Sequence, residues 1–98
     1  MILVRDVFHL KFGAAAPAKK AWVKGVEILR KSRTGSPRLL TDLVGPYYTI
    51  VLESNYKSFA DYELARQTVG KSKAWQAWYR RFVPLVDHGY REIFTIVE

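Results

Sequence analysis

The segment 58–86, SFADYELARQTVGKSKAWQAWYRRFVPLV, constrains the fold of this chain more than any other stretch, because it holds two of the three tryptophans and most of the helix-forming residues. Ser58, followed three residues later by Asp61, is typical of a helix start, since the hydroxyl accepts a free backbone N–H and the carboxylate suits the positive end of the dipole. Apolar residues recur at helical spacing on both sides of Gly70, and a glycine inside a helix costs about 1 kcal/mol relative to alanine. We therefore predict one long helix that begins at Ser58, breaks near Gly70 and ends or kinks at Pro84.

The length of 98 residues predicts a single domain over residues 1–98. No apolar run approaches the roughly 20 residues that span a bilayer, and charged residues occupy the N-terminal stretch where a signal peptide needs an apolar core. We expect a cytoplasmic protein with no membrane span. The absence of cysteine excludes a disulfide, a thiolate nucleophile and a zinc–thiolate site.

The net charge of +7 is the one unusual global property of the sequence. Such a charge is compatible with polyanion binding, but the basic residues are dispersed, with small clusters only at residues 19–20, 30–33 and 80–81. A solvated basic surface is therefore favoured over a specific nucleic-acid site.

Alternation of apolar and polar residues predicts four strands, at residues 2–12, 38–44, 47–53 and 90–97, and an amphipathic stripe predicts a helix over residues 17–31. The basic loop 30–37 and the loop 54–57 connect these elements. The short Gly45-Pro46 connection implies an antiparallel hairpin. The order β-α-β-β-α-β predicts an α+β, ferredoxin-like fold: a four-stranded antiparallel sheet with both helices on one face.

The first predicted strand carries apolar residues on both of its faces. One face holds Val4, Asp6, Phe8, Leu10 and Phe12, and the other holds Arg5, Val7, His9 and Lys11. An uncovered apolar sheet face exceeds what soluble monomers usually expose, so we predict that a second copy packs sheet against sheet as a homodimer.

Asp6 is the best single polar candidate for an inward-facing site, because it shares a strand face with apolar residues. A carboxylate there needs a partner such as Arg91 or Arg66. The candidate catalytic residues are therefore Asp6, His9 and Arg91, with no role assigned to them. Since Asp6 and His9 have opposite parity, Asp6 is expected in the pocket and His9 at the rim or the dimer side.

The aromatic residues have two interpretations, which the sequence leaves open. They either pack as core or line a pocket for a flat or hydrophobic ligand. The candidate ligand-binding residues are Trp22, Trp75, Trp78 and Tyr79, with Tyr47, Tyr48 and Tyr62 beside them.

Two local patterns do not support a cofactor or metal site. Residues 65–72, ARQTVGKS, fit a loose phosphate-loop pattern, but a capped helix precedes the GKS where a strand is required. His9 and His88 should be neighbours on antiparallel first and last strands, but two imidazoles without a third ligand rarely complete a metal site. We expect no metal and no cofactor.

The stretch from Trp75 to Phe94, W-x-x-W-Y-R-R-F-V-P-L-V-D-H-G-Y-R-E-I-F, resembles the C-terminal half of NIPSNAP-type members of the dimeric α+β barrel superfamily. Those proteins have an aromatic helix, a proline, and then a glycine leading into an R-E-I-[YF] strand. The resemblance implies a homodimer whose two sheets form a barrel, with a pocket between sheet and helices in each subunit. It does not imply one chemistry, since relatives include cofactor-free monooxygenases of aromatic polyketides, haem-degrading monooxygenases, lactone isomerases and members with no known activity. Haem-degrading relatives use an Asn on the first strand, which this chain lacks, so that site is not carried over.

Two functions from different classes remain. The first is binding of a small hydrophobic or aromatic molecule, with a cofactor-independent monooxygenase or isomerase among the activities that the resemblance allows; whether the protein is an enzyme stays open. The second is an RNA-binding module, because RNA-recognition domains share the element order and the chain is basic. The stretch YYTIVLES, however, lacks the aromatic motif of such modules. Oligomeric state separates the two, since the first needs the open sheet face covered and the second needs it free.

Overall fold

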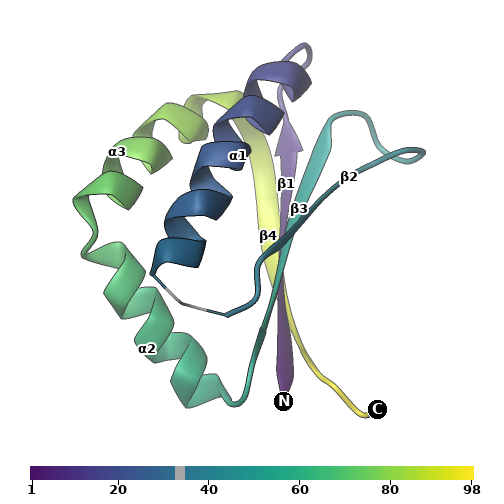
Figure 1. Ribbon diagram of the computed structural model, residues 1–98. Coiled ribbons are helices and arrows are strands. Elements are labelled where there is room, and N and C mark those ends of the chain that lie inside the picture. The colour runs from purple at the N-terminus through teal and green to yellow at the C-terminus, as the bar shows by residue number, and fades with distance from the viewer. Residues whose placement is uncertain (33–34) are drawn as a thin grey trace.

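Residues 1–32 and 35–98 fold into one antiparallel sheet with their helices on one face (Figure 1). A computed structural model describes residues 1–32 and 35–98. The elements in chain order are β1 (Ile2–Leu10), α1 (Ala15–Lys31), β2 (Arg38–Thr41), β3 (Thr49–Tyr56), α2 (Phe59–Gly70), α3 (Lys73–Phe82), the 3-10 helix η1 (Val83–Leu85) and β4 (Val86–Thr95). Part of the predicted basic loop, Arg33 and Thr34, lies outside the described residues.

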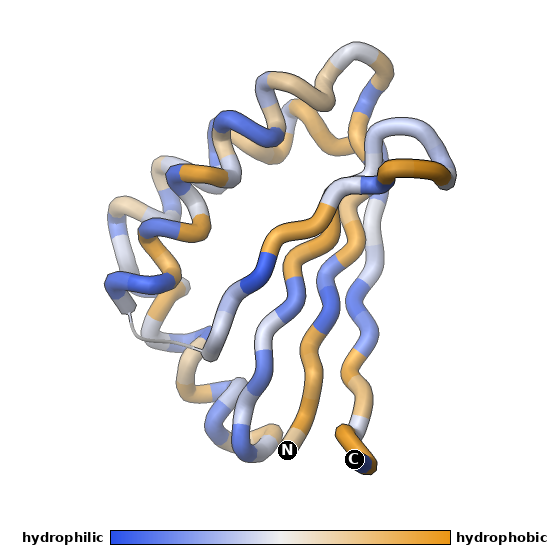
Figure 2. The backbone as a smooth tube through the Cα atoms, turned by 45° about the vertical axis from the view of Figure 1, so that its right-hand side comes forward, coloured by the Kyte–Doolittle hydropathy of each residue, from blue (hydrophilic) through white to orange (hydrophobic). Residues whose placement is uncertain are grey.

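The sheet has the strand order β2-β3-β1-β4, and every neighbouring pair is antiparallel. This order, with the helices packed on one side, confirms the predicted α+β ferredoxin-like fold. None of the described helices covers the opposite side, which comes forward in Figure 2. No helix in the part of the chain that the structure describes is long and apolar enough to cross a membrane.

The hydrophobic core lies between α1, α3 and the sheet. Its largest fully buried side chains are Trp22, Trp78, Phe82 and Ile50. The rings of Trp22 and Trp78 meet edge to face, with centroids 4.4 Å apart, which is a favourable aromatic geometry. Trp78 also donates its indole N–H to the carbonyl oxygen of Ala21 at 2.6 Å, so that the buried nitrogen is satisfied.

The predicted long helix is divided into two helices. Ser58 caps α2 as expected, since its Oγ accepts the backbone N–H of Asp61 at 3.2 Å. A second cap, at Ser72, was not predicted: its Oγ accepts the N–H of Trp75, also at 3.2 Å, and begins α3 in a new direction (Figure 1). Gly70 is the last residue of α2, so the break falls where the sequence placed it, while the new start depends on Ser72.

The strand bounds differ from the predicted ones at the sheet ends. The first strand stops at Leu10, so Phe12, predicted to lie on the same strand face as Asp6, falls outside the strand and is 83% exposed. The second strand stops at Thr41 because Asp42 closes a loop over residues 42–48, its Oδ1 accepting the N–H of Thr49 at 3.0 Å. The loop places Leu43 and Val44 almost fully in solvent.

The last two strands also begin or end away from the predicted bounds. The third strand runs from Thr49 to Tyr56 where residues 47–53 were expected. The fourth strand begins at Val86, ahead of the predicted start at Tyr90, because the turn that contains Pro84 is a short 3-10 helix that leads directly into it. This earlier start brings His88 into the sheet.

Candidate functional site

A cavity of about 310 Å³ lies where the α2–α3 corner meets the sheet. Residues of β1, β3, β4 and all three α-helices line it, so the cavity requires the complete fold. Its apolar wall consists of Val4, Leu29, Leu52, Ala65 and Val69, with Gly70 at the helix break. Trp75 and Tyr79 of α3 add aromatic surface, and the polar lining residues are Asp6, Ser54, Tyr56, Tyr62, Arg66 and Arg91. A mostly apolar cleft with a few convergent polar groups is the usual form of a small-molecule site.

Asp6 and Arg91 form an ion pair in this cavity. They are register partners on the adjacent strands β1 and β4, and Nε of Arg91 donates to Oδ1 of Asp6 at 2.5 Å. The structure therefore supplies one of the two cationic partners that the sequence suggested for Asp6. Burial by itself lowers the pKa of Arg91, but the hydrogen bond and the negative charge of Asp6 outweigh it, so the pKa is raised and the guanidinium stays charged.

Two tyrosines of the cavity remain protonated well into the alkaline range. Burial raises the pKa of Tyr56 and of Tyr62 above the ordinary value of 10.0, although positive charge from Arg91 acts in the opposite direction on both. Tyr62 is only 5% exposed. Its hydroxyl makes no hydrogen bond within residues 1–32 and 35–98. Arg66 lies beside this phenol, and its charge and N–H groups act to lower the pKa of Tyr62, although the contact does not reach the geometry of a hydrogen bond. An unsatisfied buried hydroxyl is costly, so it marks a place where a ligand atom would be favourable.

The predicted aromatic residues divide between cavity and core. Trp75 and Tyr79 line the cavity. Trp22 and Trp78, which the sequence also suggested for the ligand, are each 1% exposed and lie in the hydrophobic core, so neither lines it. Trp75 and Trp78 are three residues apart on one helix, and periodicity alone does not separate their roles.

His9 lies on the other side of the sheet from Asp6, as its parity predicts. It is the register partner of His88, and the two imidazoles stack with centroids 4.5 Å apart. Nδ1 of His88 lies 3.0 Å from a carboxylate oxygen of Asp87. Among the described residues, no group of three or more His, Cys, Asp or Glu side chains is arranged to hold a metal ion.

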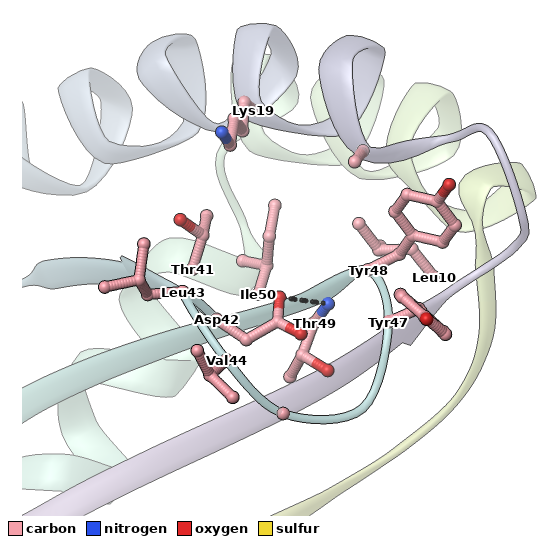
Figure 3. Close-up of a pocket in the computed structure, with 12 residues that line it drawn as sticks. Leu10, Lys19, Thr41, Asp42, Leu43, Val44, Tyr47, Tyr48, Thr49 and Ile50 are labelled. Carbon is pink, nitrogen blue, oxygen red and sulfur yellow. Dashed lines mark hydrogen bonds between the residues drawn. The ribbon is translucent and has the colours of Figure 1, made fainter.

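A second cavity, of about 500 Å³, lies under the β2–β3 loop (Figure 3). The lining includes Lys19 of α1, Leu10, and Tyr47 and Tyr48 of the loop. Tyr48 has φ 59°, an unusual value for a residue other than glycine. Sequence reasoning placed both tyrosines in a strand and so missed this cavity; the turn-forming Gly45-Pro46 pair was the available signal for a loop there.

The cavity under the β2–β3 loop has fewer polar groups suited to binding a ligand than the cavity at the α2–α3 corner. Its wall is formed by a loop whose residues Leu43 and Val44 are 98% and 93% exposed, and the carboxylate of Asp42 already accepts from the backbone of Thr49. The cavity at the α2–α3 corner combines an ion pair, an unpartnered hydroxyl and stacked aromatic surface on strands and helices. That cavity is therefore the stronger candidate site.

Comparison with known proteins identifies relatives of the whole chain. The family model described as NIPSNAP matches residues 5–98. An uncharacterized NIPSNAP domain protein from Burkholderia xenovorans superposes with a TM-score of 0.89 at 18% identity, over 99% of this chain and 95% of that chain. A NIPSNAP family protein of unknown function from Agrobacterium tumefaciens superposes with a TM-score of 0.88 at 23% identity, over 96% of this chain and 86% of that chain. An antibiotic biosynthesis monooxygenase superposes with a TM-score of 0.79 at 14% identity, over 100% of both chains. No curated protein matches the chain.

Proposed function

The chain belongs to the NIPSNAP family, and from that premise we propose that it binds a small hydrophobic or aromatic molecule in the cavity at the α2–α3 corner. The observation that carries the proposal is the cavity itself: an apolar and aromatic wall around the single ion pair of Asp6 and Arg91. An apolar wall favours burial of a ligand body, and a few polar groups fix its orientation.

The reaction class that fits this arrangement is a cofactor-independent oxygenation or isomerisation, with the antibiotic biosynthesis monooxygenase among the fold neighbours as support. Such reactions begin with loss of a proton from carbon or oxygen of the substrate. Asp6 is the carboxylate in the cavity that can accept a proton, and Arg91 is the cation that can stabilise the oxyanion produced. Catalysis would thus depend on two residues held opposite each other by the register of β1 and β4.

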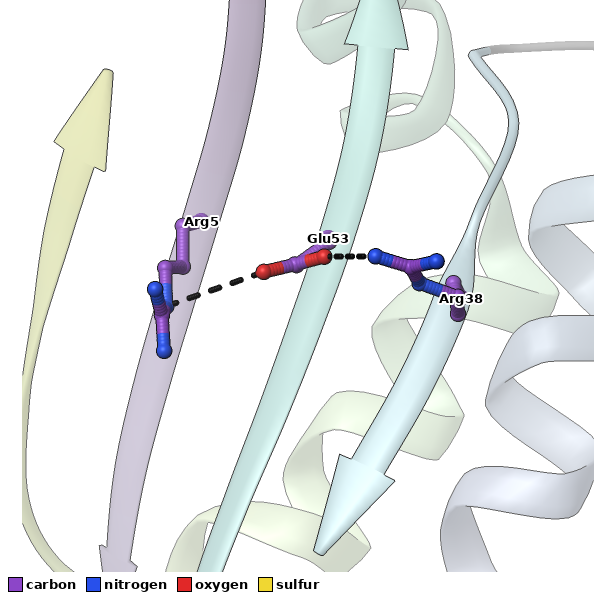
Figure 4. A network of polar contacts seen from close by, with 3 residues as sticks. All are labelled: Arg5, Arg38 and Glu53. Carbon is purple, nitrogen blue, oxygen red and sulfur yellow. Dashed lines mark hydrogen bonds and ion pairs between the residues drawn. The ribbon is translucent and has the colours of Figure 1, made fainter. Parts of the chain in front are cut away.

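We further propose that the protein is a homodimer, closed through the sheet face that the described helices leave uncovered. A row of alternating charges crosses this face, one residue from each strand: Arg38, Glu53, Arg5 and Glu92 are successive register partners. Figure 4 shows three of them, with Glu53 paired to Arg38 at 2.6 Å and to Arg5 at 3.8 Å. The exposed apolar residues on the same face include Leu40, Tyr90 and Phe94.

The charge row supports a second copy as the covering partner. A two-fold axis parallel to the strands sets β2 against the partner's β4 and β3 against the partner's β1. Arg38 then faces Glu92 of the partner subunit, and Glu53 faces Arg5 of the partner subunit, so positive meets negative throughout. Such complementarity favours a specific dimer over other pairings.

No feature of the described strands favours RNA binding, the alternative function. RNA-recognition domains stack bases on aromatic residues of the two central strands. Here the central strands β1 and β3 present Arg5, Val7, Val51 and Glu53 to the uncovered face. We expect only weak, salt-dependent association with nucleic acid, which a titration with single-stranded RNA at physiological salt would measure.

A cavity-filling variant tests ligand binding. Ala65 lines the cavity and is buried, whereas Ala60 on the same helix is exposed. A panel of flat aromatic and lipid-like compounds should include ligands for the wild type, and Ala65→Phe should abolish their binding while Ala60→Phe preserves it. Calorimetric titration measures affinity, and thermal melting confirms that both variants fold. Equal binding by wild type and Ala65→Phe, or no binding by wild type, would contradict the proposal.

A further inference from the structure

We propose that the molecule bound at the α2–α3 corner carries one anionic group, a carboxylate or an ionised phenol or enol, at the end of its apolar body, and that Arg91, Arg66 and Tyr62 hold that group. This inference rests on the proposed function of the cavity and specifies the chemical class of its ligand. It is drawn from the balance of charges and hydrogen-bond donors that line the cavity.

The charges that line the cavity favour an anionic ligand. Two arginines, Arg66 and Arg91, line the cavity against a single carboxylate, Asp6. In the free protein water can hydrate the excess charge, since the side chain of Arg91 is 44% exposed. An apolar ligand that enters the cavity displaces this water, and a cation that loses its hydration needs a negative partner. An anionic group on the ligand supplies that partner.

The orientation of Arg91 also favours an anionic ligand. Its Nε is held by Asp6, which fixes the guanidinium plane beside the ring of Tyr62, with the guanidinium carbon 5.9 Å from the ring centroid. Among the described residues, Asp6 is the ion-pair partner of Arg91, and the hydrogen bond between them uses Nε. A guanidinium has five N–H donors in a fixed fork, a geometry that matches a carboxylate. Arg91 is therefore oriented in advance, with donors left for a second anion.

The hydroxyl of Tyr62 supplies a further hydrogen-bond donor for the ligand. It is buried and unpartnered in the described structure, and burial raises the pKa of this phenol, so it remains a donor at neutral pH. A ligand oxygen that accepts from Tyr62 would remove the cost of the unsatisfied group. A cationic ligand gains less, because Arg91 already neutralises the charge of Asp6, the one carboxylate that lines the cavity.

Three ligands of one shape and different charge test the inference. 2-Naphthoate is anionic, 2-naphthamide is neutral and 2-naphthylmethylamine is cationic, and titration calorimetry of the purified full chain gives the affinity of each. We expect naphthoate to bind at least about tenfold more tightly than the amide, and the amine to bind most weakly. Tyr62→Phe and Arg66→Gln should each weaken naphthoate severalfold and leave the amide unchanged. Arg81→Gln removes the same charge from an exposed residue outside the cavity and should change neither affinity.

The outcomes separate this inference from the function on which it rests. If none of the three compounds binds, both the proposed function and the inference are overturned. If the amide or the amine binds as tightly as naphthoate, and Ala65→Phe abolishes that binding, the cavity is a ligand site but its preference for an anion is wrong. If the preference for naphthoate survives unchanged in both Tyr62→Phe and Arg66→Gln, the assignment of these residues is wrong.

Discussion

Gly25 of α1 lies directly against the indole of Trp78 on α3, so closely that a Cβ at position 25 would lie 2.6 Å from Cζ2 of the ring. One helical turn earlier, the carbonyl oxygen of Ala21 accepts the indole N–H. Together, Ala21 and Gly25 form the site on α1 into which the largest side chain of α3 packs. The contact fixes how α3 lies on α1, and thereby where the cavity at the α2–α3 corner can form.

Substitution of Gly25 by Ala should destabilise the protein by roughly 1 to 3 kcal/mol, because the added methyl group overpacks the core. Alanine is the better helix former by about 1 kcal/mol, so the expected sign is opposite to that of helix propensity. Gly70 is the matched control: a Cβ there meets no heavy atom within 4 Å, and Gly70→Ala should stabilise by about 0.5 to 1 kcal/mol. Urea unfolding of both variants measures the two effects. A Gly25→Ala variant as stable as wild type would mean that the helices do not pack this closely.

The two tryptophans of α3 should respond differently to truncation. Trp78→Ala removes a side chain that is 1% exposed and should lower the free energy of unfolding by roughly 3 to 5 kcal/mol. Trp75 is only partly buried and lines the cavity, so Trp75→Ala should cost less stability and more ligand affinity. Denaturant melts and ligand titrations on both variants check this. A larger loss of stability at Trp75 than at Trp78 would reverse the assignment of core and cavity.

Stability should fall with rising pH above about 10, because of Tyr56 and Tyr62. Burial raises the pKa of both phenols in the folded protein above the ordinary value of 10.0, whereas the unfolded chain releases these protons near that value. Since the unfolded state then binds fewer protons, their contribution to stability is complete below pH 10 and is lost as pH rises through the folded pKa values. Replacing both with Phe should flatten this fall. An absorbance titration of phenolate formation in wild type and the double variant measures the ionisation of these two phenols. If the double variant loses stability with pH as wild type does, these two tyrosines are not the cause of the fall.

A lysine on the uncovered sheet face should separate the proposed dimer. Tyr90 is 54% exposed in the single chain, so Tyr90→Lys should fold, but it would bury a charge at the interface between two sheets. Leu64 of α2 is 64% exposed on the helical side, and Leu64→Lys serves as the control. Sedimentation at micromolar concentration should show dimers for wild type and Leu64→Lys and single chains for Tyr90→Lys. Single chains in all three samples would remove the homodimer.

The sequence predicts those features of the molecule that depend on a few neighbouring residues. The start of α2 at Ser58 is set by a hydrogen bond over three residues, and the inward direction of Asp6 follows from strand parity alone. The order of the elements then implied the sheet topology, which places Asp6 beside Arg91 and His9 beside His88. The end of β1 at Leu10 and the second cap at Ser72 were missed, since several residues in each region are equally able to end or begin an element.

Only the tertiary structure decided which aromatic residues are core and which line the cavity. Trp75 and Trp78 have the same residue type and the same helical spacing, yet Trp78 packs on Gly25, more than fifty residues away in the chain, while Trp75 faces the cavity. The sequence also did not predict the unpartnered hydroxyl of Tyr62, because this group is buried only where α2 packs over the sheet. Local periodicity reports which side of an element is apolar, whereas burial and hydrogen-bond satisfaction depend on segments that meet only after folding.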